Sequence, residues 1–321
     1  MKKIFIILIF NFYCFSQEHK SLFYTSTAGI NNPGFIAIND EINHLTLETI
    51  QSFDKNKKTS NSSIFYGNTY FQDYNFFLGY KVSSNYFSNI GLGEAKLELS
   101  YTHRLRLNPK YILYPFISAH FRIPSKFSNL YFEDQIFSGL SSNDPVLDYY
   151  KAKGYIDFNS GFLIKNQNLF FGLSINNITK ANTSSNNELA VKIGRSADIN
   201  LGLQKEFKNF GLFAMGTYFH RPTLDKGINF SEFRLDQEII FYNFSINIFE
   251  EFFSNTYSNG LKSIGMSFIF PIENYEIGLG YKSNLNESIR SNDNFIGLIF
   301  KFNFDTLPFA TFLKWEDSDY Y

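Results

Sequence analysis

The sequence predicts an all-β transmembrane protein: an antiparallel up-and-down β-barrel of about fourteen strands, with short periplasmic turns and longer extracellular loops. Large apolar residues alternate with small or polar ones in segment after segment. The segments are about ten residues long, close to the roughly 9–11 residues that cross a bilayer at a tilt. Tight links alternate with longer ones. The aromatic content of 19%, mostly Phe and Tyr, also favours strands over helices.

The first 16 residues are predicted to be a Sec signal peptide. Lys2 and Lys3 form a positive region, and an apolar stretch from Ile4 to Phe10 follows. This stretch is too short for a membrane-spanning helix, and cleavage is expected after Ser16. The only cysteine, Cys14, lies inside this segment. The mature chain is therefore expected to lack disulfides, thiolate metal sites and thiol catalysis.

Residues 17–41 are predicted to enter the barrel as a plug. About fourteen strands enclose an interior wider than their own side chains can fill. The segment carries few charges and contains the apolar stretch Phe35-Ile36-Ala37-Ile38. In the motif Asn31-Asn32-Pro33-Gly34, the proline and glycine allow sharp turns. Both asparagines are expected to hydrogen-bond to inward-facing polar groups. The alternative is a loose periplasmic leader.

The barrel itself is predicted to span residues 42–304. Near its end, Ile296, Leu298 and Phe300 alternate with Gly297 and Lys301. The first set is expected to face lipid and the second the lumen. An even strand number returns both barrel ends to the periplasm. The predicted strands are 42–53, 62–71, 74–83, 90–105, 110–122, 154–165, 168–179, 196–207, 210–221, 228–241, 243–252, 260–270, 274–284 and 294–304.

The links between these strands assign the two ends of the barrel. The predicted tight turns lie near Gln72-Asp73, Asn108-Pro109, Asn166-Gln167, Lys208-Asn209, Tyr242 and Ile272-Glu273. The other links are read as longer, and the longest runs from 123 to 153. Its aromatics Phe127, Tyr131 and Phe137 are candidate anchors for a partner, or else pack the loop onto the barrel rim. Residues 305–321 are expected to form a periplasmic tail.

No catalytic, cofactor or metal constellation is found. The net charge of −1 includes no basic stripe for nucleic acid. His103 and His120 lie on adjacent predicted strands and could approach each other, although interfacial or lumen positions are favoured over a metal pair. Glu94, Lys96 and Glu98 share one strand face and are interpreted as solvated lumen charges. The glycines that recur inside strands are interpreted as small lumen-facing residues.

Three short stretches resemble the PorP/SprF family of outer-membrane proteins of the type IX secretion and gliding machinery. They are Asn32-Pro33-Gly34-Phe35; Glu133-Asp134-Gln135 followed by Asp157-Phe158-Asn159-Ser160-Gly161; and Phe171-Gly172-Leu173-Ser174-Ile175-Asn176-Asn177-Ile178. The one departure is Gly34, where the family usually has alanine. The resemblance implies an outer-membrane protein of a Gram-negative bacterium. Its partners would be the membrane lipid, the secretion components and a secreted, adhesin-like surface cargo, without catalytic residues or a cofactor.

Two other function classes remain open. One is a FadL-like or porin-like channel for small molecules, for which the longest loop lacks the basic residues of a charged constriction. The other is a barrel enzyme, disfavoured because no Ser/His or Asp/His set lies at the strand tops. A neighbouring gene for a very large surface protein would favour the secretion role. Large, stable conductance in planar bilayers would favour the channel.

Overall fold

The computed structural model describes residues 21–24, 26–30, 32–37, 43–54, 57–88, 92–124, 153–182, 193–222, 229–254, 259–285 and 293–304. Several expectations lie outside the described residues. These are the signal peptide 1–16, the motif residue Asn31, the loop aromatics Phe127, Tyr131 and Phe137, and the tail 305–321.

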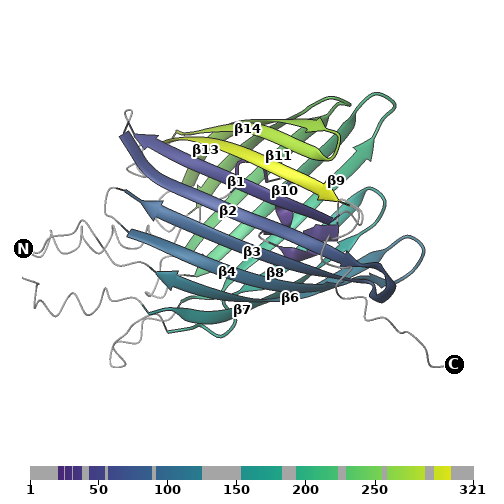
Figure 1. Ribbon diagram of the computed structural model, residues 1–321, viewed down its shortest axis with the longest axis horizontal. Coiled ribbons are helices and arrows are strands. Elements are labelled where there is room, and N and C mark those ends of the chain that lie inside the picture. The colour runs from purple at the N-terminus through teal and green to yellow at the C-terminus, as the bar shows by residue number, and fades with distance from the viewer. Residues whose placement is uncertain are drawn as a thin grey trace, which may run out of the picture.

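The described strands form one closed antiparallel barrel (Figure 1). Each strand pairs with its neighbours in sequence, β1 pairs with β15, and β4 pairs directly with β6. The two-residue β5 continues β4, so fourteen strands surround the lumen. Their bounds are β1 Asn43–Asp54, β2 Lys57–Phe71, β3 Phe76–Phe87, β4 Leu92–His103, β5 Leu105–Arg106, β6 Ile112–Pro124, β7 Tyr155–Lys165, β8 Leu169–Asn176, β9 Ser196–Glu206, β10 Gly211–Pro222, β11 Asn229–Ile240, β12 Ser245–Ser254, β13 Asn259–Ile272, β14 Tyr275–Asn284 and β15 Asn294–Phe304.

These strands confirm the predicted barrel, and the largest difference in the strand bounds is the start of β2. Strand β2 begins at Lys57 instead of 62, so only residues 55 and 56 separate it from β1. The expectation of a longer link here is wrong. The early part of β2 is polar and shows no apolar alternation. It nevertheless pairs with the end of β1, where Asp54 lies opposite Lys57. Main-chain pairing beyond the apolar band does not require large outward side chains.

The two faces of the barrel follow the predicted alternation. Leu201 and Leu298 are 63% and 53% exposed on the outer surface, whereas Asn200, next to Leu201, is 1% exposed inside. The glycines singled out in the sequence, at 161, 172, 202, 265, 278, 280 and 297, face inward as expected, whereas Gly67 and Gly216 face outward. An apolar exterior above a polar or small-residue interior is the pattern of a strand that has lipid on one side.

The inner face is less polar than the alternation predicts. Phe77, Tyr114, Phe170 and Phe213 point inward and are buried. They pack with apolar residues of the N-terminal segment in one cluster, and a second cluster includes Phe249 and the segment residue Leu22. The expectation of a wet lumen face is therefore wrong in these sectors. Inward aromatics are stable here because a second apolar surface covers them.

That surface is the N-terminal segment, residues 21–37, which includes the short 3₁₀ helices η2 (Ala28–Ile30) and η3 (Pro33–Ala37). Figure 1 shows these turns in purple within the outline of the barrel. Helix η3 contacts β3, β4, β6 and β7. A third short helix, η4 (Gln72–Tyr74), forms the tight turn between β2 and β3. No helix in the described ranges is long and apolar enough to span a membrane.

Candidate functional site: the occupied lumen

The first contact between the N-terminal segment and the wall is a turn at residues 21–24. Glu48 of β1 points into the lumen and is fully buried. Its Oε1 accepts a hydrogen bond from the Ser21 hydroxyl and one from the Leu22 main-chain N–H, each at 3.0 Å. The Ser21 hydroxyl also accepts a bond from the Phe23 N–H at 2.9 Å. One wall carboxylate thus fixes the start of the segment through a side chain and a main-chain group.

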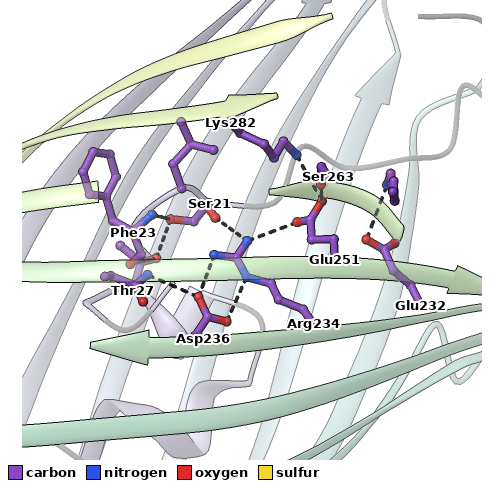
Figure 2. A network of polar contacts seen from close by, with 12 residues as sticks. Ser21, Phe23, Thr27, Glu232, Arg234, Asp236, Glu251, Ser263 and Lys282 are labelled. Atoms are coloured by element: carbon purple, nitrogen blue, oxygen red, sulfur yellow. Dashed lines mark hydrogen bonds and ion pairs between the residues drawn. The ribbon is translucent and has the colours of Figure 1, made fainter. Parts of the chain in front are cut away.

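A cationic side chain, Arg234 of β11, contacts the same turn (Figure 2). Its Nη1 donates to the Ser21 carbonyl oxygen at 2.8 Å and to Glu251 at 3.2 Å. Its Nε and Nη2 form a two-bond contact with the Asp236 carboxylate, each at 2.8 Å. A bidentate pair of this kind is a strong and geometrically specific contact. Arg234, Asp236 and Glu251 are all completely buried.

Two aromatic rings enclose the Arg234 guanidinium. Its central carbon lies 4.0 Å from the centroid of the Phe249 ring on the wall and 4.9 Å from that of Tyr24 on the segment. Such contacts gain strength when the cation is desolvated. Glu251, the second carboxylate on Arg234, also accepts bonds from Ser263 at 2.6 Å and Lys282 at 3.4 Å. The wall charges therefore neutralise one another, and the segment adds to a network that is already paired.

A groove of glycines receives the next two side chains of the segment. A Cβ atom added to Gly280 would lie 3.0 Å from the Leu22 Cβ, and one on Gly297 would lie 2.8 Å from a Leu22 methyl. One on Gly278 would lie 2.9 Å from the Phe23 ring. Leu22 and Phe23 are fully buried. The glycines of β14 and β15 thus leave the space that these two side chains fill.

The motif of the sequence forms the second contact with the wall. The Asn32 side-chain oxygen accepts a bond from the Gly34 N–H at 2.9 Å, and its amide donates to Asn200 of β9 at 3.4 Å. Thr102 of β4 donates to the Pro33 carbonyl at 3.3 Å. Asn32 is 1% exposed. The described motif residues therefore lie in the lumen, where Asn32 both caps a turn and contacts a polar inward side chain.

Close packing explains why glycine suits position 34. A Cβ atom added there would lie 2.9 Å from the Cβ of Leu163 on β7, closer than real Cβ atoms come. Alanine would therefore require a shift of the segment or the wall. The next residue, Phe35, packs edge-on against Phe170 of β8, with ring centroids 5.5 Å apart. Ile36 lies over Gly79 of β3, where an added Cβ would approach it to 3.0 Å.

A second cluster of wall charges lies on β3 and β4. Lys81 donates to the Ile30 carbonyl at 2.8 Å and pairs with Glu98 at 2.7 Å. Lys96 pairs with the same carboxylate at 3.1 Å. Lys96 and Glu98 share the inner face as predicted, but they are buried and paired, not solvated. Glu94, nearer the strand start, is only partly buried and contacts Arg122 at 3.4 Å.

The two histidines considered as a pair lie on opposite faces of the wall. His120 points inward on β6, opposite Glu98. His103 lies on the outer side, where its ring stacks on Tyr101 and its Nδ1 is 3.0 Å from the Tyr101 hydroxyl. The expectation that they could approach is wrong, because the register sets Thr102 against Phe116, several positions from His120. No group of potential metal ligands occurs within the part of the chain that the structure describes.

Fourteen tilted strands with an apolar exterior and a polar, charged interior define an outer-membrane β-barrel fold. The profile of the type IX secretion system membrane protein PorP/SprF matches residues 15–302, and the chain belongs to this family. The predicted resemblance is thereby confirmed. The family description names a secretion membrane protein, not an enzyme. No curated protein matches the chain.

Solved structures support the same fold at low sequence identity. The TodX deltaS2S3 mutant, a monoaromatic hydrocarbon channel, superposes with a TM-score of 0.53 and 10% identity over 87% of this chain and 94% of that chain. The CymD monoaromatic hydrocarbon channel gives 0.51 and 11% over 88% and 92%. At this identity the likeness concerns the fold alone.

Proposed function

We propose that this protein is an outer-membrane component of the type IX secretion system that binds a secreted, adhesin-like cargo protein and helps to export it or to retain it at the cell surface. The observation that carries the proposal, beside the family match, is the occupied lumen. Residues 21–37 contact inward-facing residues around the wall, on β1, β3, β4, β7, β8, β9, β11, β14 and β15. A barrel filled in this way is better suited to holding a partner than to passive diffusion.

Partner binding would then use the rims and loops of the barrel. The longest link, residues 125–152, lies outside the described residues, and we propose it as the partner-binding element, with Phe127, Tyr131 and Phe137 as anchors. Aromatic side chains dominate binding hot spots because they bury a large area at low conformational cost. In the proposed orientation this link is extracellular, the short turns are periplasmic, and the chain reaches the membrane through the cleaved signal 1–16.

A channel for small apolar molecules is the second candidate. It is favoured by the likeness in fold to TodX and CymD, which are monoaromatic hydrocarbon channels. The inward aromatic cluster around Phe170 and Phe213 would suit an apolar solute, but the segment residues Phe35 and Ile36 already cover it. The channel function therefore requires that the lumen be emptied, whereas the secretion function does not.

Co-purification from native outer membranes tests the proposal. The wild-type protein should bring down a large surface protein or a secretion subunit, identified by mass spectrometry. A variant with residues 126–150 replaced by a short Gly-Ser linker should insert equally well but lose that partner. Replacing the link 223–228 in the same way is the matched control and should keep it. Retention of the partner by the first variant would refute the binding role of this link.

Conductance in planar bilayers separates the two candidates. The secretion role with an occupied lumen predicts no large, stable openings in the wild-type protein. Regular openings that close when a small aromatic solute is added would instead favour the channel. Both experiments use the complete mature chain.

A further inference from the structure

The lumen wall recognises the N-terminal segment largely through its main chain. Four wall side chains from four strands contact main-chain N–H or carbonyl groups of the segment. They are Glu48 on the Leu22 N–H, Arg234 on the Ser21 carbonyl, Lys81 on the Ile30 carbonyl and Thr102 on the Pro33 carbonyl. Every polypeptide carries these groups. Main-chain contacts of this kind supply affinity in peptide recognition, and side-chain pockets supply selectivity.

The wall also has such pockets. The groove at Gly280 and Gly297 accepts an aliphatic residue followed by an aromatic one, here Leu22 and Phe23. A further space lies at Gly172 of β8, where an added Cβ would approach the Phe35 ring to 3.1 Å. The wall thus has space for an aromatic side chain at two positions of the segment, one in each half.

Most of the charged side chains of the wall that contact the segment also have partners on the wall itself. Arg234 keeps Asp236 and Glu251, and Lys81 keeps Glu98. Such internal pairing would keep the site formed while its occupant is absent. Glu48 is the exception. Both hydrogen bonds to its Oε1 come from the segment, and its Oε2 is buried with no hydrogen-bond partner. A buried carboxylate in this state is strongly favoured to bind an N–H or hydroxyl donor.

We propose that the inner wall is a peptide-binding site, that residues 21–37 are its intramolecular ligand, and that a segment of the secreted cargo replaces them. The replacing segment would carry a small hydroxyl residue followed by an aliphatic and an aromatic residue, the pattern of Ser21-Leu22-Phe23. The cargo as the source rests on the function proposed above. The tether through residues 38–42 gives the intramolecular ligand a high effective concentration. Cargo held at the rim would compete at a similarly high local concentration.

The test converts the tethered segment into a free ligand. A protease site replaces residues 39–41, the full mature chain is folded into nanodiscs, and the link is then cut. A fluorescent peptide with the sequence of residues 17–37 is added, and its binding is followed by anisotropy. We expect saturable exchange with the cut segment. A peptide carrying Leu22→Asp and Phe23→Asp should bind at least about tenfold more weakly, which corresponds to about 1.4 kcal/mol.

Wall variants give the matched comparison. Glu48→Gln should weaken peptide binding because it removes the negative charge from the side chain that accepts hydrogen bonds from the Leu22 N–H and the Ser21 hydroxyl. Glu94→Gln, on the inner face but without a contact to the segment, should bind as the wild type does. The proposal is overturned if the cut segment never exchanges, or if exchange ignores both the peptide changes and Glu48→Gln. The cargo-binding function would still be supported in that case if replacing residues 126–150 abolished co-purification of the partner. The peptide-binding proposal can therefore fail without the proposed function failing.

Discussion

Adjacent residues on opposite faces of β15 give a direct test of how the barrel and its N-terminal segment share the lumen. Leu298 faces outward near mid-strand, opposite Leu279 of β14. Arginine at a lipid-facing midplane site should cost about 2–4 kcal/mol of folding free energy. Gly297 faces the lumen, where the simple expectation is a much smaller cost. The structure changes this expectation, because a side chain at 297 would meet Leu22 at 2.8 Å.

The cost of Gly297→Arg therefore comes from displacing the segment. Losing the burial of Leu22 alone is worth about 1.5–3 kcal/mol. The two arginine substitutions should then cost similar amounts of folding free energy. A double-mutant cycle with Leu22→Ala distinguishes the cause of one cost from that of the other. Truncating Leu22 removes the methyl that obstructs position 297, so Gly297→Arg should cost less in that background. Leu298→Arg should cost the same in both backgrounds, because the free-energy changes of substitutions at sites without shared contacts are additive.

The assay is reversible folding into lipid vesicles, followed by urea titration and the heat-dependent gel shift of folded barrels. The expected coupling between positions 22 and 297 is about 1.5–3 kcal/mol, and that between 22 and 298 is within about 0.5 kcal/mol. Coupling of equal size for both pairs, or none for 297, would show that Leu22 does not lie against β15.

Three further predictions concern the anchors of the segment. Arg234→Met should destabilise the barrel by about 3–5 kcal/mol in the same urea titration, because it leaves two buried carboxylates without their main partner. As a control, Lys205→Met, at an exposed strand end, should cost under about 1 kcal/mol. Cysteines at Gly34 and Leu163 should form a disulfide on mild oxidation, visible as a gel shift. Their Cβ positions start 2.9 Å apart, and a shift of the segment by about 1 Å gives the roughly 3.5–4.5 Å that a disulfide requires. Failure to form it would contradict the placement of the motif. Asn32→Ala should make the segment more sensitive to protease while the barrel stays folded, and unchanged cleavage would remove its anchoring role.

The strands could be predicted from the sequence because each is specified locally. Alternation within β14 or β15 needs only ten or so neighbouring residues to show which face meets lipid. Turn residues such as those near Asn166 and Lys208 then mark the ends. The early start of β2 was missed because residues 57–61 are polar, and pairing with β1 determines their structure.

The contacts of the lumen could not be predicted in the same way. The bond between Arg234 and Ser21 joins residues 213 positions apart, and that between Glu48 and Leu22 joins residues 26 positions apart, each between a wall strand and the N-terminal segment. No periodic pattern carries such pairings. A partial signal lies in charges of opposite sign at successive positions on the inner face of one strand. Arg234 on β11, one position along the same face from Asp236, is one such place.

The inward aromatics are the most informative departure from alternation. In an aqueous lumen, Phe77, Phe170 and Phe213 would each expose apolar surface to water, at a cost of about 1.5–3 kcal/mol per side chain. They are buried because Phe35, Ile36 and their neighbours cover them. Ser21 and Tyr24 of the same segment lie against Arg234, which is completely buried together with its carboxylates, and the exclusion of water strengthens their mutual attraction. The barrel wall and residues 21–37 therefore form one core.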